Sequence, residues 1–248
     1  MGDVVYFRAT DNEHGAELWR TDGTEAGTML VKDIDPGPGS GVPSNFMDFN
    51  GMLHFITWNA ATGRRLWRSD GTEAGTQMLL SLEDLPALND WNDFAVMGDR
   101  IFFRGTDTAN DPKLWSTDGT PAGTQLVAGT GPGNTFNTLQ DLMAYEGNLY
   151  FKAFDPVHGE EPWTSDGTEA GTRMLAETYP GPASPGPWPP FFTGAGGLVF
   201  FRAPTVNSSD ELWVTDGTGP GTHLVRDIYP GPNSSVPSNL IEHNGQLL

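Results

Sequence analysis

The sequence contains no cysteine and only three lysines. The lack of cysteine excludes disulfide bonds, thiol catalysis and cysteine-ligated metal sites. With so few basic residues the formal net charge is −19, so the surface should repel nucleic acid and anionic membranes. We therefore expect neither nucleic acid nor an anionic membrane as a partner, whereas a cation such as Ca²⁺ would be attracted.

Long apolar runs are also missing. The longest runs are far below the roughly 18 residues that a membrane-spanning helix needs, so we expect no membrane insertion. Residues 1–3 lead directly into strand-like sequence without the pattern of a signal peptide. The 32 glycines and 20 prolines favour turns over long helices, while 14 phenylalanines and 8 tryptophans can fill a core.

One segment of the chain occurs five times. "ELWRTDGTEAGTMLV" is followed by "RLWRSDGTEAGTQML", "KLWSTDGTPAGTQLV", "EPWTSDGTEAGTRML" and "ELWVTDGTGPGTHLV". The tryptophans of these segments are separated by 48, 48, 48 and 50 residues, from their positions 19, 67, 115, 163 and 213. A fixed period of this length indicates a repeat architecture.

Each period holds four short strand-like segments, such as "MLHFIT", "RLWRS", "QMLLSL" and "DFAVMG". Four strands in about 45–50 residues are typical of a β-propeller blade. We predict an all-β, five-bladed β-propeller with four antiparallel strands per blade. It would be a single domain over residues 1–248, with repeats at approximately 1–49, 50–97, 98–145, 146–194 and 195–243.

The two ends of the chain favour ring closure. "SNFMDFNGMLHF", at 44–55, resembles "SNLIEHNGQLL", at 238–248, whereas the N-terminal "VVYF" resembles the later "MLHF". The first period therefore lacks its leading strand and the C-terminus supplies a spare one. We expect Asn239–His243 to join the N-terminal blade, and residues 244–248 to form a closing tail that is either frayed or the start of a longer array.

The segment "HGAELWRTDGTEAGTMLVKDIDPG" resembles the ELWxxDGTxxGT repeat of bacterial secreted and surface proteins, sometimes called hyalin-like. The resemblance covers nearly the whole chain and implies an extracellular or cell-surface location. Repeat 3 departs from the pattern with "TANDPKLW". The family is mostly uncharacterised, so the resemblance implies no specific activity.

The repeated residues themselves favour a structural role. Asp-Gly is a strong hairpin signal, because glycine tolerates positive φ and aspartate binds nearby backbone amides. The tryptophans would fill the space between blades. The alternative, five Ca²⁺ or sugar sites, lacks the D-x-[DN]-x-[DN]-G spacing of a calcium loop.

The loops that follow each fourth strand differ between repeats, and variable loops on a rigid scaffold often bind ligands. They contain Trp91, Phe136 and Trp188, which either contact a carbohydrate or pack locally. The first strand of each blade begins with an Asn or Asp in four repeats. We expect these residues, Asn45, Asp93, Asp141 and Asn239, at the channel mouth, where Asp93 and Asp141 could hold Ca²⁺ or where all four only cap the loop.

We therefore predict a non-catalytic extracellular binding or adhesion module for a glycan or surface polymer. It would be a monomer or part of a longer surface protein. One alternative is a glycoside hydrolase that uses Asp93, Asp141 and Glu242 as acid and base. Another is a structural spacer that binds nothing. The near-regular repetition argues against catalysis, which needs carboxyls in distinct environments.

Overall fold

The computed structural model describes residues 4–129, 136, 138–182, 192–207 and 209–248. Apart from one short 3₁₀ turn, η1 (Leu82–Asp84), its regular structure is all strand, and antiparallel pairing joins consecutive strands, as in β5–β6 and β13–β14. No helix of the described residues is long and apolar enough to span a membrane. The all-β prediction is confirmed.

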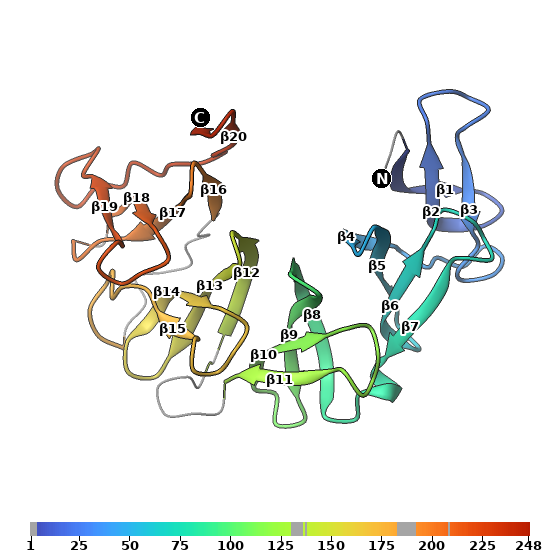
Figure 1. Cartoon of the computed structure of the whole chain (residues 1–248), viewed down its shortest axis with the longest axis horizontal. Coiled ribbons are helices and arrows are strands. Elements are labelled where there is room, and N and C mark those ends of the chain that lie inside the picture. Colours follow the sequence, from blue (N-terminus) through green and yellow to red (C-terminus); the bar gives the residue numbers. More distant parts are fainter. Residues whose placement is uncertain (1–3, 130–135, 137, 183–191, 208) are drawn as a thin grey trace. The chain divides into compact units, whose positions relative to one another are not determined.

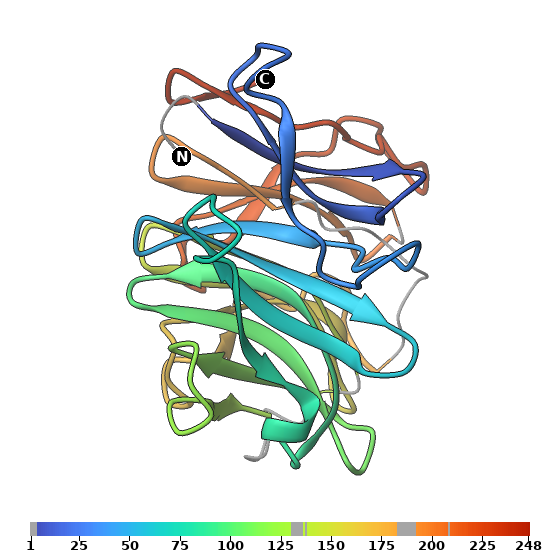
Figure 2. The same ribbon diagram turned by 90° about the vertical axis from the view of Figure 1, so that its right-hand side faces the viewer.

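The strands form a series of sheets in chain order (Figures 1 and 2). A three-stranded sheet holds β1 (Val5–Asp11), β2 (Gly15–Thr21) and β3 (Met29–Lys32). The second sheet holds β4 (Ser44–Phe49), β5 (Met52–Asn59), β6 (Gly63–Ser69) and β7 (Gln77–Ser81). The third holds β8 (Leu88–Met97), β9 (Arg100–Asp107), β10 (Pro112–Thr117) and β11 (Gln125–Ala128). The fourth sheet holds β12 (Thr138–Tyr145), β13 (Asn148–Asp155), β14 (Gly159–Ser165) and β15 (Arg173–Met174). The fifth holds β16 (Thr193–Ala195), β17 (Leu198–Pro204), β18 (Asp210–Thr215) and β19 (His223–Arg226). The last two strands, β20 (Glu242–His243) and β21 (Gln246–Leu247), pair with each other.

Four sheets thus have the four strands that the period predicts, but the five-bladed ring is not confirmed. The first sheet has three strands, with β1 at its edge. The C-terminal strand β20 pairs with β21. The chain forms two compact units, of which one comprises Met1–Trp91, Asp99–Ile101 and Thr117–Gln125, and the other Asn92–Gly98, Phe102–Ser116 and Leu126–Leu248.

A phenylalanine on the second strand of a sheet faces the repeated tryptophan on the third strand. Phe55 lies opposite Trp67 in the first unit, and Phe201 lies opposite Trp213 in the second. The ring planes are nearly parallel, with centroids 6.3 and 6.5 Å apart. Phe55 and Phe201 are fully buried, so these pairs form the centre of their sheets.

The DGT segment forms a hydrogen-bonded turn between the third and fourth strands. In the second sheet, Oδ1 of Asp70 accepts from the backbone N–H and the hydroxyl of Thr72, at 2.9 and 2.7 Å. The Thr72 hydroxyl accepts from the N–H of Gly75 at 3.0 Å. Thr76 donates to the Thr72 carbonyl at 2.6 Å and bonds to Ser69 at 2.7 Å. The same bonds recur in the other four turns.

Steric contact explains the second glycine of the motif. A Cβ on Gly75 would lie 2.0 Å from Oδ1 of Asp70, and the four equivalent glycines are as close to their own aspartates. The repeated Asp, Thr and Gly residues therefore make contacts with one another, in agreement with the structural reading of the motif.

In three repeats a buried glutamate, two residues before the tryptophan, binds the loop that follows the fourth strand. Glu17 accepts from the backbone N–H groups of Ile34 at 3.0 Å and Gly41 at 2.6 Å. Glu161 accepts from the N–H and hydroxyl of Thr178, both at 2.8 Å. All three of these loop-binding glutamates, Glu17, Glu161 and Glu211, are fully buried.

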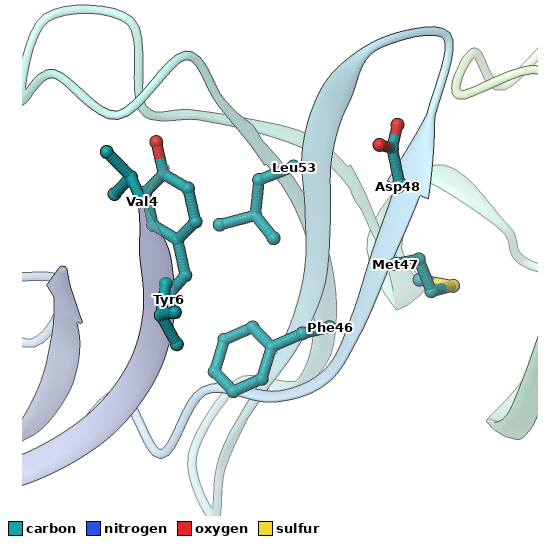
Figure 3. A pocket seen from close by; sticks show the side chains of 7 residues that line it. Val4, Tyr6, Phe46, Met47, Asp48 and Leu53 are labelled. Atoms are coloured by element: carbon teal, nitrogen blue, oxygen red, sulfur yellow. The ribbon is translucent and has the colours of Figure 1, made fainter. Parts of the chain in front are cut away.

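Strand β1 is uncovered where its counterparts are buried. Val5 is 62% exposed, but the equivalent residues on the second strands of the other sheets are exposed by 5% or less. A cavity of about 290 Å³ lies beside β1 within the first unit. Figure 3 shows Val4 and Tyr6 on one side of it, and Phe46 and Leu53 on the other. The four buried counterparts of Val5 are Leu53, Ile101, Leu149 and Val199.

The turn geometry predicts coupling between Asp70 and Gly75. Gly75→Ala should lower the free energy of unfolding by about 1–3 kcal/mol, because the new methyl group displaces the Asp70 carboxylate. In the background of Asp70→Ala the same change should cost far less, since the clashing group is gone. Chemical denaturation of the four chains of this double-mutant cycle measures the coupling. Equal costs of Gly75→Ala in both backgrounds would contradict the clash.

Burial raises the pKa of Glu161 from its ordinary value of 4.5 to about 7, against the opposing effect of the hydrogen bonds from Thr178 and Tyr179. Between these two pH values the folded state binds more protons than the unfolded state, so stability falls as pH rises. The stability difference between the wild type and Glu161→Gln should therefore shift against the wild type from pH 4 to pH 8, by at most about 3 kcal/mol.

Denaturation of both chains across this pH range measures the difference, in which the titration of the other carboxyls cancels. A difference that moves in favour of the wild type as pH rises would contradict the raised pKa. It would show instead that the loop amides hold the ionised form.

Candidate functional site

The four Asn and Asp residues expected at the channel mouth share a backbone conformation. Asn45, Asp93, Asp141 and Asn239 have φ values of 50°, 51°, 59° and 57°. The left-handed region is costly for most residues, but Asn and Asp tolerate it best after glycine. Around two of them the pairing shifts register, between Ser44 and Met47 and between Gln140 and Met143. A bulge at this place is therefore enough to select an Asn or Asp.

Asp93 and Asp141 are the two of these residues that interact. The backbone N–H of Asp141 donates to the carboxyl of Asp93. Burial raises the pKa of Asp93, the charge of Asp141 raises it further, and Arg104 lowers it. Loss of hydration also raises the pKa of Asp141, while Lys152 lowers it. The second unit thus holds a carboxyl pair flanked by two cationic side chains.

This pair can hold a proton or orient hydroxyl groups, but it offers little to a metal. Ca²⁺ requires six to eight oxygen ligands. Within the described ranges, no group of three or more His, Asp or Glu side chains could hold a metal ion. Glu242, the third carboxyl of the hydrolase alternative, is exposed and accepts a bond from the N–H of Gly245 at 2.6 Å. Asn45 and Asn239 are also exposed.

The structure buries two of the three aromatic residues expected to contact a ligand. Trp91 is 0% exposed, and its indole N–H donates to the carbonyl of Arg64 at 3.3 Å. Phe136 is 1% exposed and packs edge-on against Phe151 and Trp163, at centroid distances of 5.9 and 5.1 Å. Neither ring has a face available to a ligand, so both act as packing residues here. Trp188 lies outside the described residues.

The sequence interpretation missed two features of the structure. The loop-binding glutamates occur where the loop reads "DIDPGP", "ETYPGP" or "DIYPGP", and repeats 2 and 3 have Arg65 and Lys113 in that place instead. The residue two before the tryptophan and the loop sequence change together between repeats, so the sequence alone could have revealed this contact. It also missed His54, whose neighbours come from two different repeats.

Trp91→Ala should lower the free energy of unfolding by about 3–5 kcal/mol, because it leaves a large cavity among buried side chains. Trp58→Ala is the matched control, since Trp58 is 50% exposed and should cost less than about 1 kcal/mol. Thermal and chemical denaturation measure both. If Trp91→Ala were as mild as Trp58→Ala, the ring would be exposed in solution and again a candidate ligand contact.

No protein-family model matches the sequence, and no curated protein matches it. Solved structures do match at low identity. A prolyl endopeptidase is 12% identical with a TM-score of 0.59, over 89% of this chain and 32% of its own. The uncharacterised protein lmo1340 of Listeria monocytogenes EGD-e is 8% identical with a TM-score of 0.52, over 90% and 61%.

A puromycin hydrolase is 14% identical with a TM-score of 0.56, over 90% of this chain and 38% of its own. This chain therefore spans about a third of the length of the two enzymes. At such identities the likeness concerns the fold alone. Together, the sheets and these structural neighbours support a β-propeller-like all-β fold.

Proposed function

We propose that this chain is a non-catalytic binding module for a glycan or surface polymer of the cell exterior. The observation that carries the proposal is that the repeated polar groups form hydrogen bonds with other groups of this chain. The DGT turns and loop-binding glutamates are occupied by bonds within the chain. They hold the turns and junction loops in place, so recognition is left to positions that do not repeat.

The fold proposed for this function is a five-bladed propeller in which Asn239–His243 completes the first blade. The exposure of Val5, against the burial of its four counterparts, supports a missing strand beside β1. The C-terminal hairpin has the geometry of a first-to-second-strand hairpin. Asn244 and Gly245 have φ values of 52° and 77°, close to the 53° and 71° of Asn50 and Gly51.

The carboxyl pair Asp93 and Asp141 favours a second candidate, a glycoside hydrolase. Each carboxyl has a raised pKa, and the charge of one raises the pKa of the other. Paired carboxyls whose proton affinities differ can serve as acid and base. Both face cationic side chains as well, so a purely structural network explains the same shifts.

A panel of neutral and acidic polysaccharides in affinity electrophoresis, with and without Ca²⁺, tests the proposal. We expect retardation by at least one polymer without release of oligosaccharides, as judged by mass spectrometry. Release of products that stops in Asp93→Asn and Asp141→Asn would favour the hydrolase instead. Retardation by none of the polymers would contradict the binding function and favour a spacer.

A further inference from the structure

An aromatic ring on the second strand of one sheet covers the DGT glycine of the next in three places. A Cβ on Gly71 would lie 2.2 Å from the hydroxyl of Tyr6, and one on Gly217 would lie 2.9 Å from that of Tyr150. Phe102 covers Gly167 in the same way, at 2.9 Å. A six-membered ring therefore fills the space above this glycine in three of the five repeats, whereas Gly23 of the first repeat has no described neighbour within 4 Å of an added Cβ.

At Gly119 the pattern is broken. The equivalent residue is His54, and a Cβ on Gly119 would meet only Leu79, at 3.2 Å. The shorter imidazole leaves a cavity of about 190 Å³ within the first unit. It lies beside Gly119, at the place that a ring occupies over Gly71, Gly167 and Gly217. Its lining includes Phe49, Asn50, His54, Arg68, Leu79 and Asp118.

The polar groups of this cavity can recognise hydroxyl groups. His54 is 5% exposed, and its Nδ1 lies 3.2 Å from the carbonyl of Met52. Burial lowers the pKa of His54, so the ring is neutral at pH 7. With Nδ1 as the donor, Nε2 is an acceptor, and it has no hydrogen bond to another described residue. Phe49 packs edge-on against this ring, at a centroid distance of 5.1 Å.

The charges of the cavity disfavour an anionic ligand. Oδ1 of Asp118 accepts the bonds of the DGT turn from Thr120, and these bonds lower the pKa of Asp118 and keep it ionised. Arg68 also lines the cavity, and its guanidinium donates to Gln77 at 3.1 Å. A carboxylate, a guanidinium, an amide and a neutral imidazole together match a neutral ligand with several hydroxyl groups.

We propose that this cavity binds one neutral pyranose ring, such as a terminal hexose of a glycan. The proposal rests on the function proposed above and gives it a site away from the carboxyl pair. The sugar ring would lie where Tyr6 and Tyr150 place theirs, with hydroxyls toward His54 and Arg68. A ligand with so few atoms should bind with a Kd on the order of 1 mM.

Nuclear magnetic resonance of the His54 ring tests this site with the methyl glycosides of glucose, galactose and mannose. Titration to roughly 50 mM should give a saturable shift with at least one of them. His54→Tyr should abolish it, because the tyrosine restores the ring of the other junctions. In that variant, resonances of Asn50 and Gly119 replace the lost His54 signal. Arg68→Gln, on an exposed side chain, should weaken binding about tenfold.

Tyr150→Phe, at the same position in another sheet, is the matched control and should leave binding unchanged. The site is overturned if no glycoside gives a saturable shift, if binding persists in His54→Tyr, or if Arg68→Gln binds as tightly as the wild type. It is also overturned if phenol saturates the cavity and the glycosides do not. Polymer retardation that survives His54→Tyr would refute this site alone. If the wild type binds neither a polymer nor a glycoside, the proposed function is refuted as well.

Discussion

The bond from each DGT threonine to its aspartate is the interaction on which the rest of the structure depends. It closes the turn between the third and fourth strands, and the glycine five residues after the aspartate exists only because the carboxylate occupies the space of a Cβ. The turn then contacts the neighbouring sheet. Arg20 donates to the carbonyl of Gly71 at 3.1 Å, and Arg173 to that of Gly217 at 2.8 Å. One motif therefore sets both the hairpin and a contact between adjacent sheets.

The loops after the fourth strands are held by a different device. A buried glutamate is costly unless its oxygens are hydrogen-bonded, and here the loop amides supply the donors. Repeats 2 and 3 carry cations in that position and have loops of another sequence. In repeat 2 the residue before that cation, Arg64, pairs with Asp90 beside the buried Trp91. We expected these loops to vary in sequence for recognition. They vary partly because different side chains bind them in different repeats.

The period, the strand-rich pattern and the Asp-Gly turns were enough to predict the four-stranded sheets, since all three are local properties of the chain. The site was harder. Trp91 lies within β8 and faces the interior, which a loop-based reading could not show. The sequence predicts Asn45, Asp93, Asp141 and Asn239 either as convergent ligands or as loop caps, and a left-handed backbone alone favours these residue types.

The cavity at His54 illustrates a further limit. Within its own repeat the histidine is a small change in an aromatic strand. Its consequence appears only against the turn of the next repeat, where Gly119 has no ring above it. The repeated residues explain the sheets and turns, and we propose that a ligand binds where one repeat departs from the others.

Hydrogen–deuterium exchange of β1 tests most directly whether every sheet, the first included, is covered by a first strand. β5 is the internal standard, because β4 already covers it. If Asn239–His243 completes the first sheet, the amides of Val5–Asp11 should exchange about as slowly as those of Met52–Asn59, and much faster once residues 238–248 are removed. Fast exchange of β1 in the full chain, unchanged by the truncation, would contradict a completed first sheet.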